Sequence, residues 1–145
     1  MTRILVTGGA GYVGSVSAEA LLAAGHEVLV LDDLSTGHRA AVPEGATLDT
    51  GTYTDPGTLT RLFQTNGIEA ILHCAARSLV GESIADPSKY FRENVAGGIG
   101  LLEAARAAGV GRLVFSSSAA VYGIPDVTPI EEDSPLRPIN PYGES

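Results

Sequence analysis

Short apolar runs alternate with amphipathic segments along the whole chain. Five apolar runs predict β-strands: residues 3–7, 27–31, 46–49, 69–75 and 112–118. The run at 46–49 is the weakest, and the other four are nearly all apolar. Strands without a polar face are typical of a parallel sheet that is covered on both sides, so the pattern predicts an α/β chain.

The segments between these runs carry helix signals. Residues 12–24 place apolar side chains at helical spacing. Asp55-Pro56 and Asp86-Pro87 each combine a capping aspartate with a proline in the first turn. We therefore expect helices from these points to about residue 66 and about residue 108. Pro141-Tyr142 begins a last helix after a proline-rich loop.

This order of elements predicts a doubly wound, Rossmann-type parallel sheet, with residues 1–145 as one NAD-binding domain. Ligands of such sheets bind beyond the carboxyl ends of the strands. Functional residues are therefore expected at five places: after Thr7, after Leu31, after Asp49, near Ala75 and at Ser116-Ser117-Ser118.

Composition and charge narrow the possible partners. The formal net charge of -8 disfavours nucleic acid and anionic membranes, which require a basic surface. No apolar run approaches the roughly 20 residues of a membrane helix, and no signal peptide is recognisable. Cys74 is the single cysteine, so the cytoplasm is the expected compartment, and its apolar surroundings predict a small buried hydrophobe.

The first predicted strand runs into a glycine-rich turn with Gly8, Gly11 and Gly14. Glycine here allows a tight turn, close approach of a pyrophosphate and close packing of the following helix, whose N-terminus attracts phosphate. Asp32 ends the second strand at the expected separation and can accept hydrogen bonds from an adenosine ribose, which favours NAD over NADP. The alternative is a simple tight turn with Asp32 capping a loop. Asp33 is either a second ribose contact or a solvated side chain.

Ser118 and Tyr142 are the candidate catalytic pair. A hydroxyl and a phenol near one strand end suit proton transfer to and from an alcohol oxygen. Because the unperturbed pKa of tyrosine is about 10, the phenolate needs a nearby cation. A lysine one helical turn later would stand at position 146, and the chain as given ends at Ser145. From the residues alone, packing is the commoner role of a tyrosine after a proline.

Six motifs occur in the order and at the spacing of a known family: TGGAGYVGS, LDDLSTG, HCAARSLVGES, NVAGG, RLVFSSSAAVYG and NPYGES. The chain resembles the extended short-chain dehydrogenase/reductases along its whole length, and within them the UDP-glucose 4-epimerases. The resemblance implies bound NAD and interconversion of UDP-glucose and UDP-galactose by transient oxidation at C4. Tyr142 would remove the proton of the sugar 4-hydroxyl while hydride passes to the nicotinamide, and Ser118 would hydrogen-bond the same oxygen.

The resemblance also implies the remaining site residues. The expected substrate contacts are Ser78, Ser118, Tyr122 and Tyr142. The expected NAD contacts are Gly8, Gly11, Tyr12, Val13, Gly14, Asp32, Asp33, Ser35, Thr36, Gly37, Ala75, Ala76, Asn94, Ser116 and Tyr142. The partners it implies are a nucleotide sugar and a second copy of the parent enzyme, paired through helices that include the one beginning near Asp86.

Some positions depart from the family or remain open. The sugar-nucleotide 4,6-dehydratases place an acidic pair where this chain has Ala119-Ala120, which argues against elimination of water. Another sugar-nucleotide enzyme of this family, such as a UDP-glucuronate-modifying one, and a non-catalytic NAD-binding protein remain alternatives. Thr52 stands where the family has an aspartate near adenine, and Asp49 could supply that acid in a shifted register. Gly97-Gly98 in mid-helix predicts close packing there.

A few other side chains carry groups that could take part in a site. His73 is expected to be a structural residue. Tyr122 either lines the sugar pocket or packs against other residues, and both roles remain possible. Arg77, Ser78 and Glu82 are expected on the loop after the fourth strand. No residues have metal-ligand spacing. Because the resemblance extends to the N-terminal part of the family only, we expect the 145 residues alone to be inactive, with the fifth strand at a sheet edge.

Overall fold

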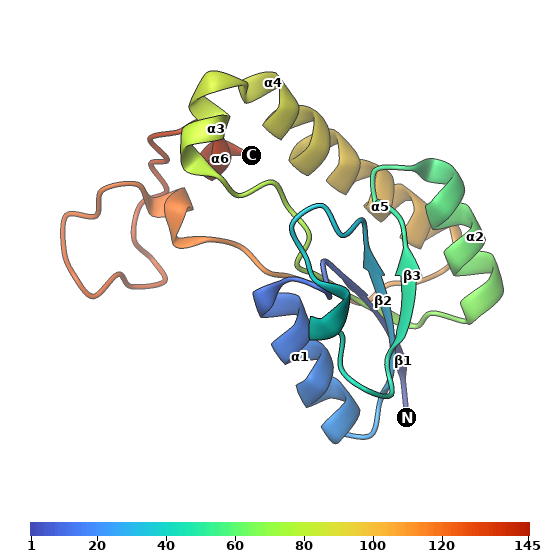
Figure 1. Ribbon diagram of the computed structural model, residues 1–145. Coiled ribbons are helices and arrows are strands. Elements are labelled where there is room, and N and C mark those ends of the chain that lie inside the picture. The colour runs from blue at the N-terminus through green and yellow to red at the C-terminus, as the bar shows by residue number, and fades with distance from the viewer. The chain divides into compact units, whose positions relative to one another are not determined.

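Five parallel strands form one sheet in the order β3-β2-β1-β4-β5 in the computed structural model, which describes residues 1–145 (Figure 1). The strands are β1 (Arg3–Thr7), β2 (Glu27–Asp32), β3 (Thr47–Thr50), β4 (Ala70–His73) and β5 (Leu113–Phe115). The parallel sheet and the Rossmann-type fold are therefore confirmed. Two compact units make up the chain, residues 1–76 with 97–116 and residues 77–96 with 117–145.

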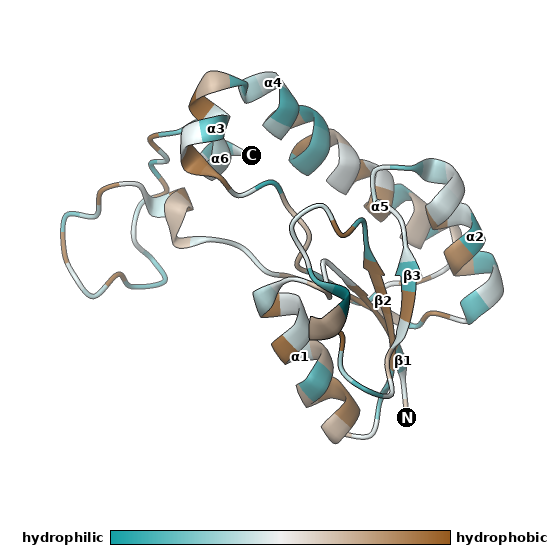
Figure 2. Ribbon diagram, viewed as in Figure 1, coloured by the Kyte–Doolittle hydropathy of each residue, from teal (hydrophilic) through white to brown (hydrophobic).

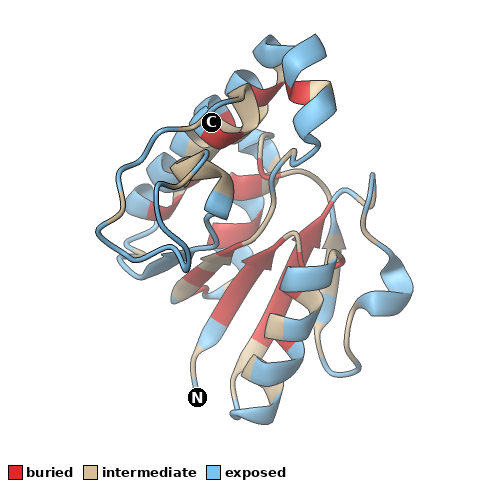
Figure 3. Cartoon of the chain, turned by 90° about the vertical axis from the view of Figure 1, so that its left-hand side faces the viewer, coloured by how far each residue is buried: buried red, intermediate tan, exposed pale blue.

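The first unit contains the sheet and three main helices: α1 (Tyr12–Ala23), α2 (Pro56–Asn66) and α5 (Gly97–Ala107), with a 3-10 turn, η1 (Arg39–Ala41). Alternate residues of β1 point to opposite faces of the sheet. Leu5 belongs to a core cluster with residues of α2 and α5, whereas Ile4 and Val6 belong to a cluster with Ala18 of α1. Strands β1 and β2 are strongly apolar (Figure 2), and they contain most of the buried strand residues of the unit (Figure 3).

The predicted capping signals work as expected. The Asp55 carboxylate accepts a hydrogen bond from the Thr58 amide at 2.7 Å, which begins α2 directly after the aspartate. Gly67 ends that helix in the left-handed conformation, with φ 58°. Asp86 likewise accepts from the Lys89 amide at 3.2 Å. Sequence-local chemistry therefore determines where these helices begin and end.

The predicted helix from Asp86 to about residue 108 is not one uniform α-helix. It consists of α4 (Pro87–Tyr90), a π-helix, η2 (Phe91–Ala96), and α5. The expected close packing holds at Gly97, where an added Cβ would lie 2.6 Å from Thr54 Cγ2. It is wrong for Gly98, which has nothing within 4 Å of that position.

β5 is shorter and more exposed than the apolar run 112–118 predicted. Only three residues pair with β4, and Leu113, Val114 and Phe115 are all exposed, Val114 at 64%. The physical reason is its position at the edge of the sheet, which was expected. β4 is also shorter than predicted, and it ends at His73.

The second unit is mostly helical turns and loop. It contains α3 (Val80–Ala85), α4, η2, a 3-10 turn, η3 (Ala119–Tyr122), and α6 (Pro141–Glu144). The sequence reasoning missed α3, which has no capping side chain, and η3, a turn of four residues that is too short to show an amphipathic pattern. No helix of the structure has the length and apolar character needed to cross a membrane.

Candidate functional site

The glycine turn between β1 and α1 is built by backbone contacts that exclude larger residues. Gly8 has φ +72°, and an added Cβ there would lie 2.7 Å from the Ala75 amide nitrogen. A Cβ on Gly14 would lie 2.2 Å from the Gly8 carbonyl oxygen. Gly11 differs, because its added Cβ would meet only the Gly8 oxygen, at 3.3 Å. Packing therefore requires two of these glycines, while the space beside Gly11 is open.

The N-terminus of α1 has the features of an anion site. Gly11 is the N-cap residue and no side chain caps the first turn, which also contains no acidic residue. Tyr12 is 87% exposed and Val13 is also exposed. The free amides and the positive end of the helix dipole are therefore open to an anion of the size of a phosphate.

Asp32 at the end of β2 supports the glycine turn. The side chain is only 8% exposed, and its two oxygens accept hydrogen bonds from the Ala10 amide at 2.9 Å and the Leu34 amide at 2.8 Å. The loop-capping role that was the alternative in the sequence is thus present. A carboxylate has about four acceptor sites in total, so two backbone bonds leave acceptor capacity for a ribose hydroxyl.

The loop after Asp32 surrounds this carboxylate. A Cβ on Gly37 would lie 2.9 Å from Asp32 Oδ1, so a larger residue would press on the carboxylate. The Asp33 carboxylate accepts hydrogen bonds from the Ser35 amide at 2.9 Å and the Ser35 hydroxyl at 2.6 Å. Asp33, Ser35 and Thr36 are exposed, and they lie just beyond the carboxyl end of β2.

The ends of β4 and β5 supply the other predicted residues of this unit. Ala75 and Ala76 follow β4, and Ser116 follows β5. Cys74 is half-buried rather than fully buried as predicted. Burial raises the pKa of its thiol, and a hydrogen bond with the Ser116 side chain partly offsets this. A thiol in such surroundings stays protonated, in line with the non-nucleophilic role expected from the sequence.

His73 is a structural histidine, as predicted. Its ring is buried, shares a 2.6 Å hydrogen bond between Nδ1 and Thr7 Oγ1, and stacks on Phe115 with ring centroids 5.6 Å apart. Burial lowers the pKa of His73 to about 4, so the ring is neutral near pH 7. The hydrogen bond between Thr7 and His73 joins the carboxyl ends of β1 and β4, beyond which the candidate site residues follow in the sequence.

Asp49 and Thr52, the two candidates for the adenine contact, already have partners. Asp49 forms a bidentate ion pair with Arg61, with N–O distances of 2.7 and 2.8 Å. The Thr52 hydroxyl hydrogen-bonds the Thr54 hydroxyl at 2.9 Å. An acid held by a bidentate arginine has fewer free acceptor positions, which leaves Asp49 less available for a further contact.

Ser118 and Tyr142 belong to the second unit. Sequence reasoning put Ser118 at the end of the fifth strand, but β5 ends at Phe115. Ser118 instead caps η3, and its hydroxyl accepts a hydrogen bond from the Ala120 amide at 3.2 Å. The strand is shorter because pairing with β4 stops at His73.

Helix α6 carries Tyr142 and packs directly on η3. Asn140 caps α6 by accepting a hydrogen bond from the Gly143 amide at 2.8 Å. A Cβ on Gly143 would lie 2.6 Å from the Ala120 oxygen, so the two turns touch backbone to backbone. This contact brings together the two turns that carry the candidate catalytic pair.

Asn94 fastens the end of α6. Its side-chain oxygen accepts from the Arg77 amide at 2.8 Å, and its nitrogen donates to the Arg77 carbonyl and to the Ser145 hydroxyl, each at 3.0 Å. The Ser145 hydroxyl donates to the Tyr142 carbonyl at 3.0 Å. The structure thus gives Asn94 a clear role in holding the unit together, in addition to the cofactor contact expected from the resemblance.

Residues 77–82 differ from the expected loop. Arg77 is ion-paired with Glu93, and Ser78 is exposed. Glu82 lies on α3, not on a loop, because the segment after Leu79 forms a helical turn. Its carboxylate accepts from Lys89 Nζ at 2.7 Å, and this hydrogen bond together with one from the Tyr90 hydroxyl lowers the pKa of Glu82.

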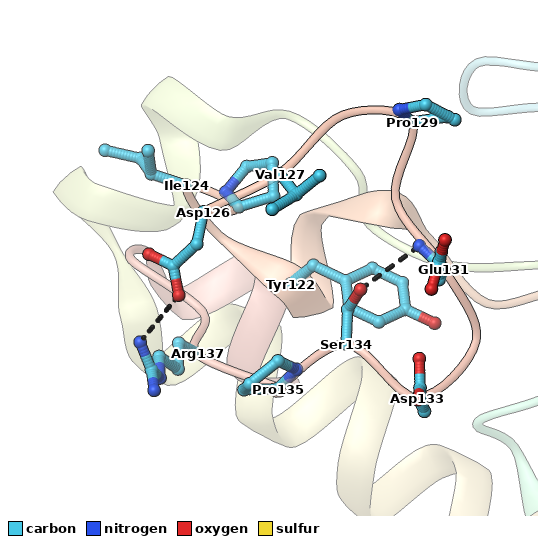
Figure 4. Close-up of a pocket in the computed structure, with 11 residues that line it drawn as sticks. Tyr122, Ile124, Asp126, Val127, Pro129, Glu131, Asp133, Ser134, Pro135 and Arg137 are labelled. Carbon is cyan, nitrogen blue, oxygen red and sulfur yellow. Dashed lines mark hydrogen bonds and ion pairs between the residues drawn. The ribbon is translucent and has the colours of Figure 1, made fainter.

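Tyr122 lines a cavity of about 360 Å³ formed by its own loop, residues 122–137 (Figure 4). The charged residues of the lining are Asp126, Glu131, Asp133 and Arg137, and Arg137 is paired with Asp126 at 3.5 Å. Three carboxylates against one paired cation repel a diphosphate. This cavity therefore does not fit the phosphates of a nucleotide sugar. No group of three or more histidine, cysteine or acidic residues could hold a metal ion.

Comparison with known proteins places these features in a family. The model of the NAD dependent epimerase/dehydratase family matches residues 4–145. The chain is 54% identical to UDP-glucose 4-epimerase of Streptomyces lividans and 52% identical to that of Corynebacterium glutamicum, over 99% and 97% of its own length. It spans 44% and 42% of the length of these two relatives.

Solved structures agree with the sequence relatives. A crystal structure of UDP-glucose 4-epimerase superposes with a TM-score of 0.94 at 43% identity, over 99% of this chain and 44% of the other. The enzyme from Brucella ovis in complex with NAD gives a TM-score of 0.93 at 42% identity, with the same coverage. The chain thus shares its fold with these enzymes over 99% of its length, and it belongs to the NAD dependent epimerase/dehydratase family.

Proposed function

We propose that residues 1–145 form the NAD-binding and proton-transferring part of a UDP-glucose 4-epimerase. The observation that carries the proposal is the open N-terminus of α1, which has a glycine N-cap, no side-chain cap and no acid in its first turn. Combined with the free space beside Gly11, it suits a pyrophosphate. UDP-glucose as substrate is supported by the names of the relatives that are 54% and 52% identical.

The first unit would hold the cofactor. The amides at the start of α1 would bind the pyrophosphate, and Asp32 would accept hydrogen bonds from the adenosine ribose. A 2′-phosphate would meet the Asp32 carboxylate, so NAD is favoured over NADP. When bound, NAD supplies the acceptor and donor of hydride that a C4 inversion requires.

The second unit would move the proton. Tyr142, as the phenolate, takes the proton of the sugar 4-hydroxyl and later returns it to the same oxygen, so no proton is gained or lost overall. Ser118 orients that oxygen through its hydroxyl, which still has a proton to donate because it only accepts from Ala120. Ala119-Ala120 offers no acid or base for elimination, which favours epimerisation over dehydration.

Two further features extend the proposal. Helix α5 exposes Ile99 and Leu102, which supports pairing of the enzyme with a second copy. The lone Cys74 supports a reducing compartment such as the cytoplasm.

Titration calorimetry with NAD and NADP tests the cofactor half on the 145-residue chain. We expect NAD to bind at least about tenfold more tightly than NADP, a difference of about 1.4 kcal/mol. Equal affinities, or no binding of either nucleotide, would overturn the cofactor assignment.

Epimerisation is tested in a hybrid in which residues 1–145 replace the matching segment of the Streptomyces lividans relative, because this chain spans only 44% of it. The hybrid should interconvert UDP-glucose and UDP-galactose, whereas the 145 residues alone should not. Tyr142→Phe should lower kcat of the hybrid by about 10²–10⁴-fold without weakening NAD binding. An active Tyr142→Phe hybrid would contradict the role of the phenol.

A further inference from the structure

Tyr90 is the largest fully buried side chain of the protein, with 0% of its surface exposed. Its hydroxyl accepts a hydrogen bond from the Leu79 amide at 3.0 Å. The hydroxyl proton lies between two acceptors, the Leu79 carbonyl at 2.7 Å and Glu82 Oε2 at 2.9 Å. A tyrosine held at its hydroxyl from three sides cannot swing, so its ring is a fixed surface inside the second unit.

The charges around Tyr90 keep it protonated. Lys89 Nζ bonds Glu82 Oε1 at 2.7 Å, which keeps the carboxylate ionised as an acceptor. Burial and the hydrogen bond to Glu82 raise the pKa of Tyr90. Tyr90 is therefore a permanent hydrogen-bond donor and is unsuited to act as a base.

The ring of Tyr90 meets the ring of Tyr142 edge to face, with centroids 6.4 Å apart and planes at 73°. This is the preferred geometry of an aromatic pair. Tyr142 lies on α6, which is one turn of four residues. A helix this short has little stability of its own, so packing must determine where the Tyr142 side chain points.

We propose that Tyr90 is the positioning residue of Tyr142. Leu79 and Glu82 fix the hydroxyl of Tyr90, and the fixed Tyr90 ring in turn sets the orientation of the Tyr142 ring. This inference rests on the proposed role of Tyr142 as proton acceptor. Asn94 holds the backbone of α6 through Ser145, whereas Tyr90 holds the side chain itself. Together the two contacts hold the backbone and the ring of Tyr142.

Three-bond couplings to Cγ of Tyr142, measured by NMR on the 145-residue chain, test the proposal directly. The native chain should show the couplings of a single χ1 rotamer. Tyr90→Leu removes the ring and should give rotamer-averaged couplings, while Tyr90→Phe keeps the ring but loses the hydroxyl anchor and should give couplings between those of Tyr90→Leu and those of the native chain. Phe91→Leu, next along the same helical run and 40% exposed, is the matched control and should change nothing.

Kinetics of the hybrid enzyme give the second readout. Tyr90→Leu should lower kcat by about tenfold with KM for UDP-galactose and NAD affinity unchanged, because a misdirected base slows the chemical step alone. If Tyr90→Leu does not fold, Tyr90→Phe decides the matter, since loss of the hydroxyl anchor should still broaden the Tyr142 rotamers measurably.

Unchanged couplings and unchanged kcat in both Tyr90 variants would overturn the inference. An inactive native hybrid would instead count against the proposed function, and the couplings on the 145-residue chain would still test the contact between the two rings.

Discussion

Gly11→Ala is expected to separate cofactor binding from folding. Gly11 has extended backbone angles, φ −85° and ψ 173°, which alanine adopts without strain. Its added Cβ would approach only the Gly8 oxygen, at 3.3 Å. The methyl group would therefore remain in the open space beside the start of α1, where the proposed pyrophosphate lies.

The magnitudes follow from these contacts. Alanine is a poorer N-cap than glycine, and the 3.3 Å contact requires a small shift, so we expect a destabilisation of about 1 kcal/mol. For a domain of this size that lowers Tm by only about 2–4 °C. Affinity for NAD should fall at least about tenfold, since the backbone can no longer approach the phosphates closely.

The assay combines thermal unfolding with calorimetric titration of NAD, because the chain has no tryptophan to report binding by fluorescence. At the same NAD concentration, Tm of the native chain should rise by more than that of Gly11→Ala. Gly14→Ala is the contrasting variant, because its Cβ would lie 2.2 Å from the Gly8 oxygen and should disturb folding itself. Native NAD affinity in a folded Gly11→Ala chain would refute the placement of the pyrophosphate.

Two further outcomes test the packing of the first unit. Gly97→Ala should lower the free energy of unfolding in urea by about 1–3 kcal/mol, because its Cβ would press on Thr54. Gly98→Ala has open space around its Cβ and should stabilise α5 by up to about 1 kcal/mol. Equal effects of the two substitutions would contradict the packing described at Gly97. The pKa of His73 is lowered to about 4 in the folded chain, so between pH 6.5 and 4 the unfolded chain binds a proton that the folded chain does not. As the pH falls through that window, the free energy of unfolding should therefore decrease by up to about 3 kcal/mol. His73→Gln should flatten this dependence, and an unchanged pH profile in that variant would count against the buried neutral ring.

Local chemistry explains why much of the first unit was predictable. β1 needed only its apolar run, and α2 needed only the aspartate that accepts from Thr58 and the glycine that ends it. These signals act within a few residues, so one sequence contains them completely. The same holds for the glycine turn, whose spacing alone indicated a tight turn after β1; the structure adds that Gly8 there lies against Ala75.

Features that depend on distant partners could not be predicted in this way. The run 112–118 has the composition of a buried strand, yet its pairing is limited by how far β4 extends, so Ser118 became a cap of η3 instead of a strand end. Glu82 became helical because α3 forms after Leu79, without a capping side chain to announce it.

The two tyrosines of the second unit illustrate what burial adds to a motif. In the sequence, Tyr90 and Tyr142 each lie within a helical segment that begins at a capped proline, and only the resemblance to a family distinguishes Tyr142. In the structure, the Tyr90 hydroxyl forms hydrogen bonds with Leu79 and Glu82. No such hydrogen bonds hold the hydroxyl of Tyr142. A base must be free to exchange its proton with substrate, and a support must not move. The hydrogen-bond partners of Tyr90 are therefore those of a support, and the proton transfer proposed above falls to Tyr142.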